Sequence, residues 1–310
     1  AMTEPKAPGG RPQAVARIET VASPPAPKPV AASPAPAALA AGGPSVTQID
    51  AASGVKINRP GGMSAPGALI IQVPQASGEA PAIALQPAPD PRLVEKSAPG
   101  PLPQRGAAGA RASEVYARPV IVSSTLKPAA PRVALYVDGV GLASGATDAA
   151  IALPPAISLA FAAVGENLPK QAAAARAAGH EILLQAPMEG ADYPVNDPGP
   201  TTLLASNPAR NIERLHMMMA RFSGYVGVSN YLGGRFLADE AALAPVLREV
   251  ASRGLFYVED VSEDRSRAGE LARKSGLAAL RADVVIDRGD GAEAVRASLE
   301  RLETLARERG

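Results

Sequence analysis

The pattern of apolar and polar positions divides the chain at about residue 131. From there to the end, short apolar runs alternate with segments whose apolar residues recur every three or four positions. Six strand–helix units in this order indicate an α/β fold with a parallel sheet or barrel and right-handed crossovers. The apolar runs predict buried strands at residues 133–137, 156–161, 181–185, 224–228, 255–259 and 283–287.

Four helices are predicted between and after these strands. The alanine-rich stretch 168–178 stops at Gly179, a residue suited to a helix C-terminus. Residues 207–222 begin with Asn-Pro as N-cap and first helical position and carry an apolar stripe. A third helix is expected to start near Pro245, because proline fits the first turn and not the interior. The last helix presents Val295, Leu299, Leu302 and Leu305 on one side.

The first 130 residues differ in composition from the rest. Of the 32 prolines, 23 lie before residue 132, and this part is rich in Pro, Ala, Gly and Ser with few large apolar side chains. Such a chain buries too little apolar surface to offset the entropy lost on ordering. We therefore expect a disordered, partly polyproline-like arm at residues 1–130 and a folded domain at residues 131–310. Two strand-like islands, residues 67–73 and 117–124, could dock on a partner or on the domain.

Charge and cysteine content narrow the possible functions. A formal net charge of +1 argues against electrostatic capture of nucleic acid. The sequence has no run of about 18 apolar residues that could span a bilayer, and no visible signal peptide. It has no cysteine, which excludes disulfides and thiolate metal sites. A long Pro/Ala arm before a domain favours an extracytoplasmic, periplasmic location, and a segment that precedes these residues could carry a membrane anchor or a signal.

Polar side chains follow most of the predicted strands. Because the carboxyl ends of parallel strands share one edge, we expect these side chains to lie together where α/β proteins place their chemistry. Capping of helices and loop backbone is the alternative role for each of them. The residues are Asp138, Gln185, Glu189, Asn230, Tyr231, Asp260 and Asp287.

The chain has two histidines and one run of methionines. His180 precedes a strand, where a structural hydrogen bond is its expected role. His216 lies in a predicted helix, and we expect it to pack or to face the surface. Residues 217–219 are all methionine and are typical of an adaptable core rather than of a soft-metal site.

Four blocks of the sequence resemble a known family. They are GHEILLQAPMEG (179–190), YPVNDPGPTTLL (193–204), GYVGVSNYLGGRF (224–236) and RGLFYVED (253–260). In this order and spacing they resemble the divergent polysaccharide deacetylases, bacterial relatives of the metal-dependent sugar deacetylases. The resemblance covers residues 131–309 and implies a deformed (β/α) barrel of about six to seven parallel strands. Since the chain stops before the family's last strands, the barrel could be open.

The resemblance also implies a chemistry, which is hydrolysis of an N-acetyl group by water on a divalent metal, with a carboxylate as base. Relatives carry two adjacent aspartates that align with Asp138 and Gly139, and Asn-His-Met-Gly that aligns with residues 230–233. They carry Asp-Ser where this chain has Glu259 and Asp260. Gly139 and Tyr231 thus stand at expected ligand positions, although glycine has no side-chain oxygen and neutral tyrosine binds metal poorly. We expect these degenerate positions to bind no metal, and we expect no cofactor.

Three functional hypotheses remain open. The favoured one is a pseudoenzyme, a catalytically degenerate domain that binds a cell-envelope glycan or an envelope protein. Asp138 would then be a vestigial base, with Glu189 as a second candidate catalytic residue, and Tyr231 could stack on a sugar. The alternatives are a zinc-dependent deacetylase of a polysaccharide such as peptidoglycan, and a tethered scaffold that recruits wall enzymes. The candidate ligand-binding residues are Gln185, Asn196, Asn230, Tyr231, Arg235 and Asp260.

Overall fold

A computed structural model describes residues 83–119, 131–260, 265–288 and 291–309, together with strands β1 (Thr47–Ile49) and β2 (Lys56–Asn58). The chain divides into two compact units, residues 1–74 and 75–310. In the first unit, β1 and β2 pair in antiparallel orientation. The strand-like island at residues 67–73 and most of the island at 117–124 lie outside the described residues.

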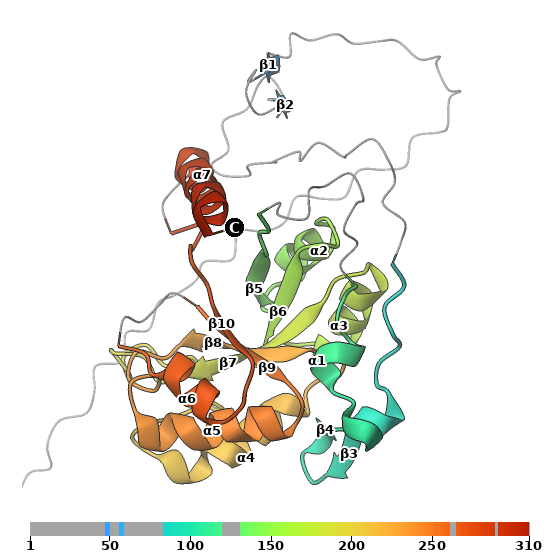
Figure 1. The fold of residues 1–310 in the computed structure, drawn as a ribbon, viewed down its shortest axis with the longest axis vertical. Coiled ribbons are helices and arrows are strands. Elements are labelled where there is room, and N and C mark those ends of the chain that lie inside the picture. The colour runs from blue at the N-terminus through green and yellow to red at the C-terminus, as the bar shows by residue number, and fades with distance from the viewer. Residues whose placement is uncertain are drawn as a thin grey trace, which may run out of the picture. The chain divides into compact units, whose positions relative to one another are not determined.

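The second unit is built on a six-stranded parallel sheet (Figure 1). Its strands lie in sequence order, and each is hydrogen-bonded to the next. This α/β architecture is compatible with a deformed barrel and confirms the predicted fold class. The strands are β5 (Tyr136–Val140), β6 (Ser158–Ala162), β7 (Ile182–Met188), β8 (Gly227–Leu232), β9 (Phe256–Glu259) and β10 (Ala279–Arg281).

Strand β7 is the centre of the sheet and the most apolar of its strands. All seven of its residues are buried, because β6 and β8 flank it and helices cover the sheet. Parallel strands buried on both faces have this near-continuous apolar sequence. The core includes Phe161 on β6, Leu184 on β7 and Tyr257 on β9, each at most 1% exposed.

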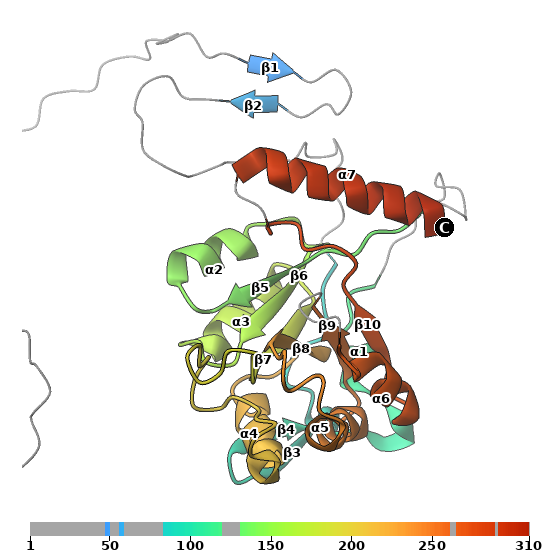
Figure 2. The same cartoon turned by 90° about the vertical axis from the view of Figure 1, so that its left-hand side faces the viewer.

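Helices lie beside both halves of the sheet (Figure 1, Figure 2). Near β5 and β6 are α2 (Ser144–Ile151) and α3 (Leu168–Ala177). Against β7, β9 and β10 pack α4 (Asn211–Met219), α5 (Glu240–Ser252) and α6 (Ala268–Lys274).

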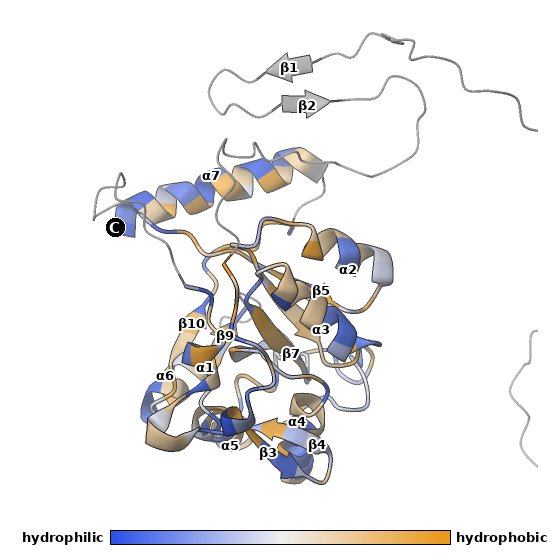
Figure 3. Cartoon of the chain, turned by 90° about the vertical axis from the view of Figure 1, so that its right-hand side faces the viewer, coloured by the Kyte–Doolittle hydropathy of each residue, from blue (hydrophilic) through white to orange (hydrophobic). Residues whose placement is uncertain are grey.

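The last helix, α7 (Gly291–Arg309), carries apolar and polar residues along its length, as Figure 3 shows. The predicted stripe lies on it, but none of its residues is buried, and Leu299 is 38% exposed. An ion pair joins Arg309 to Asp283. Within the part of the chain that is described, no helix combines the length and apolar character that a bilayer span requires.

Two of the predicted elements are displaced. Residues 283–287 form a bend and a turn, and the sixth strand is β10, at Ala279–Arg281. The sixth strand ends at Arg281 because it pairs with β9, and Arg281 is the register partner of Glu259, the last residue of β9. Helix α5 begins one turn earlier than predicted, because the Asp239 side chain accepts a hydrogen bond from the Ala242 N–H at 2.9 Å and caps it. Pro245 therefore lies inside the helix.

The prediction of a disordered arm up to residue 130 is wrong for residues 83–119. This segment forms a hairpin of β3 (Val94–Ser97) and β4 (Gly100–Pro103), two 3₁₀ turns and the short helix α1 (Ala112–Val115). Leu93, Leu102 and Tyr116 are at most 3% exposed and belong to the main hydrophobic core. The segment has few large apolar side chains of its own, but these pack on the core of the following domain, which its composition alone does not reveal.

Candidate functional site

The strands of the second unit end at one edge of the sheet, which we call the C-terminal edge. Asp138 lies on β5, Gln185 and Glu189 on or after β7, Asn230 and Tyr231 on β8, and Asp260 directly after β9. The structure therefore gathers most of the predicted polar residues near this edge. The predicted position of Asp287 is wrong. It lies in an exposed turn six residues after β10 and does not end a strand.

Gln185 fixes the position of Asp138 with both ends of its amide. Its Nε2 donates to Asp138 Oδ2 at 3.0 Å, and its Oε1 accepts from the Gly139 N–H at 2.9 Å. Gln185 is only 2% exposed, whereas Asp138 is exposed to solvent. The carboxylate is therefore both accessible and held in one orientation, which suits a base or a ligand-binding group.

Carboxylates from distant strands act on one another at this edge. Partial desolvation raises the pKa of Asp138, and the negative charges of Asp260 and Asp287 raise it further, against the lowering effect of the Gln185 hydrogen bond. Burial and the charges of Asp260 and Asp138 also raise the pKa of the Tyr136 hydroxyl. Strand β5 and the segments after β9 and β10 are therefore electrostatically coupled, although four strands separate β5 from β10 in the sheet.

The backbone at Gly139 leaves room for a side chain but strains it. Its φ is +66°, a left-handed conformation that Asp and Asn adopt more readily than other side chains do. A Cβ at this position would meet only Leu142 Cδ1 at 3.8 Å, which is ordinary contact. The aspartate that the family resemblance implies here would therefore fit sterically, at a cost in backbone strain.

The residues present do not fit the metal centre that the family resemblance implies. Gly139 offers no side-chain ligand atom, and Tyr231 stands where the family resemblance implies a histidine. Across the described residues, no three His, Cys, Asp or Glu side chains come together as a group that could hold a metal ion.

Asn230 has a structural position in the site. It is fully buried, and its Oδ1 accepts hydrogen bonds from the Tyr257 hydroxyl at 3.2 Å and from the Asp260 N–H at 3.0 Å. Its Nδ2 donates to the Leu232 carbonyl at 2.8 Å. These bonds set the turn that places Asp260, which gives Asn230 a structural role.

Tyr231 is the large aromatic side chain that β8 presents at the C-terminal edge, and it is 45% exposed. Register partners in a parallel sheet point to the same face, and residues two apart on a strand do so as well. Ser229 is the partner of Gln185, so Ser229 and Tyr231 share the face of the sheet from which Gln185 reaches Asp138. Ser229 is fully buried, and its hydroxyl oxygen has no hydrogen-bond partner among the described residues.

Glu189 lies under the loop that follows β7 and is only 1% exposed. Its Oε2 accepts from the Ser206 N–H and from the Ser206 hydroxyl, both at 3.0 Å. Its Oε1 lies 3.5 Å from Nη1 of Arg235, and the same Nη1 donates to the Tyr193 carbonyl at 3.3 Å. Glu189 therefore joins two loops, and Arg235, whose side chain is 53% exposed, links that junction to the solvent.

Asn196 lies in the exposed loop between β7 and α4. The neighbouring Asp197 shapes this loop, because its Oδ1 accepts from the Gly199 N–H at 2.9 Å and from the Thr202 hydroxyl at 3.3 Å. The structure does not bring Asn196 into contact with Asp138 or Gln185 through any hydrogen bond among the described residues.

The two histidines lie away from the C-terminal edge. His180 is fully buried, and its ring nitrogens lie 2.8 Å and 3.0 Å from the carbonyls of Ile157 and Ile151, which confirms the predicted structural hydrogen bond. His216 is partly buried in α4, where Nε2 lies 2.6 Å from Oε1 of Glu249 on α5.

Sequence reasoning missed two features of the edge. Ser229 gave no signal because a serine inside an apolar run is usually satisfied by backbone. The second feature is a set of exposed apolar side chains in or just after the strands, which periodicity alone does not reveal. They are Leu142 (61% exposed), Val164 (41%), Val195 (92%) and Tyr231 (45%).

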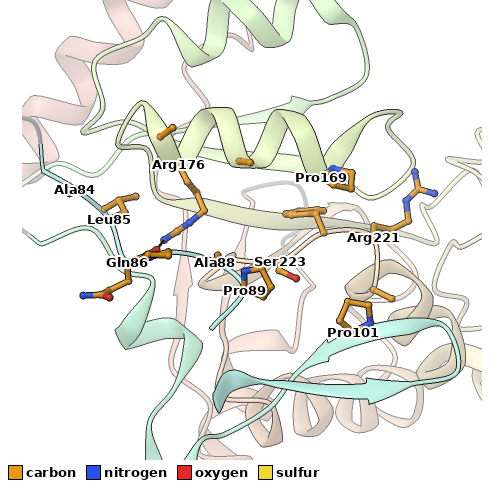
Figure 4. Close-up of a pocket in the computed structure, with 15 residues that line it drawn as sticks. Ala84, Leu85, Gln86, Ala88, Pro89, Pro101, Pro169, Arg176, Arg221 and Ser223 are labelled. Carbon is orange, nitrogen blue, oxygen red and sulfur yellow. Dashed lines mark hydrogen bonds between the residues drawn. The ribbon is translucent and has the colours of Figure 1, made fainter. Parts of the chain in front are cut away.

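A cavity of about 550 Å³ lies between the N-terminal segment, α3 and the turn that precedes β8 (Figure 4). Its walls are residues 84–89 of the N-terminal segment, Pro101, Pro169 and the turn at residues 220–223. Figure 4 shows the Arg176 side chain reaching toward Gln86, whose carbonyl accepts from Arg176 Nη2 at 2.7 Å. The polar groups here serve the packing of the segment.

Comparisons with known proteins agree with this architecture. A family model described as divergent polysaccharide deacetylase matches residues 135–310. An uncharacterised protein of Escherichia coli K12, YibQ, is 24% identical over 183 residues, which are 58% of this chain and 56% of YibQ. An uncharacterised protein of Haemophilus influenzae is 22% identical over 157 residues, 50% of this chain and 55% of its own. The chain thus spans about half the length of these curated relatives. The crystal structure of an uncharacterised protein, ATU2773 of Agrobacterium tumefaciens, is similar with a TM-score of 0.64 and 44% identity, covering 67% of this chain and 84% of that one.

Proposed function

The chain belongs to the divergent polysaccharide deacetylase family, and from that premise we propose that its domain is catalytically degenerate and binds a cell-envelope glycan without hydrolysing it. One observation carries the proposal. At the two positions where the family resemblance sets metal ligands, this chain has Gly139, with no side-chain donor, and Tyr231, an exposed aromatic ring. A centre that lacks two ligands cannot hold a catalytic ion tightly.

The remaining acidic residues do not compensate for this loss. Glu189 is buried, and both of its carboxylate oxygens face donors on Ser206 and Arg235. Asp138 keeps its place through Gln185 and stays accessible. What supports binding is therefore an accessible, oriented carboxylate on the same face of the sheet as an exposed tyrosine, a pair that suits a sugar ring and its polar substituents.

Metal content tests the loss of catalysis. The purified full chain, loaded with zinc and then dialysed, is expected to retain much less than one zinc per chain, and its melting temperature should not change on addition of a chelator. Stoichiometric zinc, together with a melting temperature that falls when the chelator is added, would show an intact metal centre and would overturn the proposal.

Restoring the lost ligands gives a positive control. The double variant Gly139→Asp with Tyr231→His should gain zinc affinity by at least about tenfold over the natural chain. A Cβ at Gly139 would meet no atom closer than 3.8 Å, so the variant is expected to fold, with some loss of stability because the φ of +66° strains a side chain there. Tyr231→His alone is the matched control and should gain little. No gain in the double variant would mean that the site was never a ligand set.

A metal-dependent deacetylase remains the second candidate function, and the geometry around Asp138 favours it. A carboxylate with a raised pKa, held by Gln185, is the arrangement of a general base. Zinc would be its cofactor. Release of acetate from N-acetylated peptidoglycan fragments by the zinc-loaded chain, lost in Asp138→Asn, would establish this function.

The proposed ligand also implies a location. A domain that binds an envelope glycan belongs outside the cytoplasm, in the periplasm, and cell fractionation with a tagged chain tests this. An envelope protein is the alternative partner, with the domain acting as a scaffold for wall enzymes; co-purification of such enzymes with a chain that fails to bind any glycan would favour it.

A further inference from the structure

Helix α7 (Gly291–Arg309) carries an apolar stripe that stays accessible to solvent among the described residues. None of the 19 residues of the helix is buried. Leu299, in the middle of the stripe, is 38% exposed, and the other apolar side chains of the stripe are only half-buried. Accessible large apolar side chains along one face of a helix mark a surface that packs on a partner. The stripe is therefore a candidate interface.

The stripe has the spacing of a coiled-coil seam. Its residues follow one another at intervals of three and four positions, so the pattern repeats every seven residues. Two helices with this spacing pack side by side along the whole seam, whereas a helix on a globular core usually has a wider apolar face. The residues of this α7 seam are Ala292, Val295, Leu299, Leu302 and Ala306.

The charges of α7 argue against a membrane surface or a nucleic acid as the partner. The helix carries four arginines and four glutamates, so its net charge is zero. Helices that bind anionic lipid or nucleic acid have an excess of basic residues on the polar face. Charges of both signs along a helix are instead typical of helices that pair with other charged helices.

A second copy of α7 matches the seam when it runs in the opposite direction. A two-fold axis at the middle of the seam places Leu299 of each copy against Leu302 of the other. The same register places Val295 of each copy against Ala306 of the other. Opposite directions also bring the positive N-terminal end of one helix beside the negative C-terminal end of the other.

The charges beside the seam are complementary in this register. Arg296 and Glu303 are seven residues apart, and each directly follows a seam residue, so both occupy the same position of the repeat. Residues at this position face each other across an antiparallel pair. Arg296 of each copy therefore lies beside Glu303 of the other, and the two-fold axis forms this ion pair twice. A parallel, in-register pair would place Glu303 beside Ser298 and would form neither ion pair.

Both charged side chains can reach a second helix. Arg296 is half-buried and Glu303 is exposed. Within the helix, Glu303 Oε2 accepts a hydrogen bond from Arg307 Nη2 at 3.0 Å, which leaves Oε1 for a second donor. Exposed pairs of this kind contribute little to stability, so the pair with Arg307 does not compete strongly with one between two copies.

We propose that α7 is a dimerisation element, which pairs with α7 of a second copy in antiparallel orientation through the α7 seam and two Arg296–Glu303 ion pairs. This inference is independent of the proposed glycan binding. A helix of 19 residues is about 28 Å long, and two such helices bury less surface than a standard protein interface does. We therefore expect a weak dimer, with a dissociation constant in the micromolar range.

Sedimentation velocity of the full chain over a range of concentrations tests the proposal. Leu299→Asp, which places a charge in the seam, should raise the dissociation constant of the dimer by at least about tenfold. Arg296→Glu and Glu303→Arg should each do the same, because each variant sets like charges against one another. Arg301→Glu reverses an exposed charge on the far side of α7 from the seam. It is the matched control and should leave dimerisation unchanged.

Combining the two charge variants gives the sharpest result. Arg296→Glu leaves only acids at the two flanking positions, and Glu303→Arg leaves only bases. Each variant alone should dimerise poorly, whereas an equimolar mixture of the two should form a heterodimer about as tightly as the natural chain. The double variant Arg296→Glu with Glu303→Arg should dimerise like the natural chain. A parallel dimer, or a helix that packs on its own domain, predicts no such rescue.

Three results would overturn the proposal. The first is a chain that remains monomeric at about 0.5 mM. The second is dimerisation that all the seam and charge variants leave unchanged, which would place the contact elsewhere on the molecule. The third is a Leu299→Asp monomer that melts well below the natural monomer, which would show that α7 packs on its own domain. Because no residue of α7 is buried, all the variants are expected to fold, and thermal melts at low concentration check this.

Discussion

The two edges of the sheet are built on opposite principles. At the edge where the strands begin, arginines satisfy backbone carbonyls: Arg176 donates to Gly224 and Gln86, and Arg105 donates to Ala251. At the edge where the strands end, acids repel one another, the buried Ser229 hydroxyl has no partner in the part of the chain that is described, and apolar side chains are exposed. The first edge stabilises the fold, and the second gives up some stability for accessible polar groups. This division is the one seen in α/β barrels, whose sites lie at the C-terminal ends of the strands.

The largest effect is expected from Arg176. It is 8% exposed, donates to the carbonyls of Gly224 at 2.8 Å and Gln86 at 2.7 Å, and lies 5.0 Å from the ring centroid of Tyr116. Arg176→Ala leaves these carbonyls without donors and should lower the free energy of unfolding by about 3–5 kcal/mol, measured by urea denaturation. Arg210→Ala, in an exposed ion pair with Glu213, should change the free energy of unfolding far less. Equal costs would mean that the strand-start edge is not the stabilising one.

A second test concerns the N-terminal segment, residues 83–119. Leu93 is 1% exposed and lies in the main core, so Leu93→Ala should cost about 2–5 kcal/mol of unfolding free energy. Leu280→Ala is the matched control, because Leu280 is 64% exposed and its truncation should change stability by less than about 0.5 kcal/mol. If Leu93→Ala has no effect, the segment is a flexible arm after all.

Leu93 also shows where sequence reasoning stops. The parallel strands were predictable because each is a short apolar run followed by a helix, and five of the six predicted strands overlap observed ones. The packing of residues 83–119 was not, because it depends on partners far along the chain. Arg253 after α5, for example, donates to Glu95 and to the Pro103 carbonyl, both at 2.8 Å. No local pattern encodes such contacts.

The candidate site was predictable in part, because its residues lie at the ends of strands that the apolar runs predict. Strand ends placed Asp138 and Tyr231 at one edge, since parallel strands share their direction. The hydrogen bonds that distinguish an accessible group from a structural one depend on tertiary geometry. Asp138 remains exposed, whereas Glu189 and Asn230 form hydrogen bonds to neighbouring loops. The position of each residue relative to its strand predicts the same place at the sheet edge for all three.

A comparison of two carboxylates sharpens the contrast between the edges. Burial alone would raise the pKa of Glu249, but hydrogen bonds from His216 and Arg253 hold this pKa below its ordinary value. Glu249 thus contributes stability above its unfolded pKa, and this contribution is lost as the pH falls through the folded pKa. Glu249→Gln should cost about 1–2 kcal/mol near neutral pH and less in acid. The measurement is urea denaturation of both chains across the acidic range.

Asp138 should behave with the opposite sign. Its raised pKa means that its contribution to stability is complete below the unfolded pKa and is lost as the pH rises through the folded pKa. Asp138→Asn should therefore leave stability unchanged in acid and raise it slightly near neutral pH, by less than about 1 kcal/mol because the group is exposed to solvent. The same denaturation series measures it. A destabilised Asp138→Asn at neutral pH would place Asp138 among the stabilising residues and break the comparison.

The smallest effect separates the edges most directly, because it compares two buried hydroxyls. Tyr225 is 2% exposed and precedes β8, and its hydroxyl donates to the Met219 carbonyl at 2.9 Å. Tyr225→Phe should cost about 0.5–1.5 kcal/mol, the net contribution of one hydrogen bond. Ser229→Ala, four residues further along, should cost nothing or raise stability by up to about 1 kcal/mol, because the serine hydroxyl is desolvated without a partner. Matched urea melts of the two variants measure both values. If Ser229→Ala costs as much as Tyr225→Phe, the serine hydroxyl is satisfied in the free protein, and the strand-end edge holds no unpaired group for a ligand to meet.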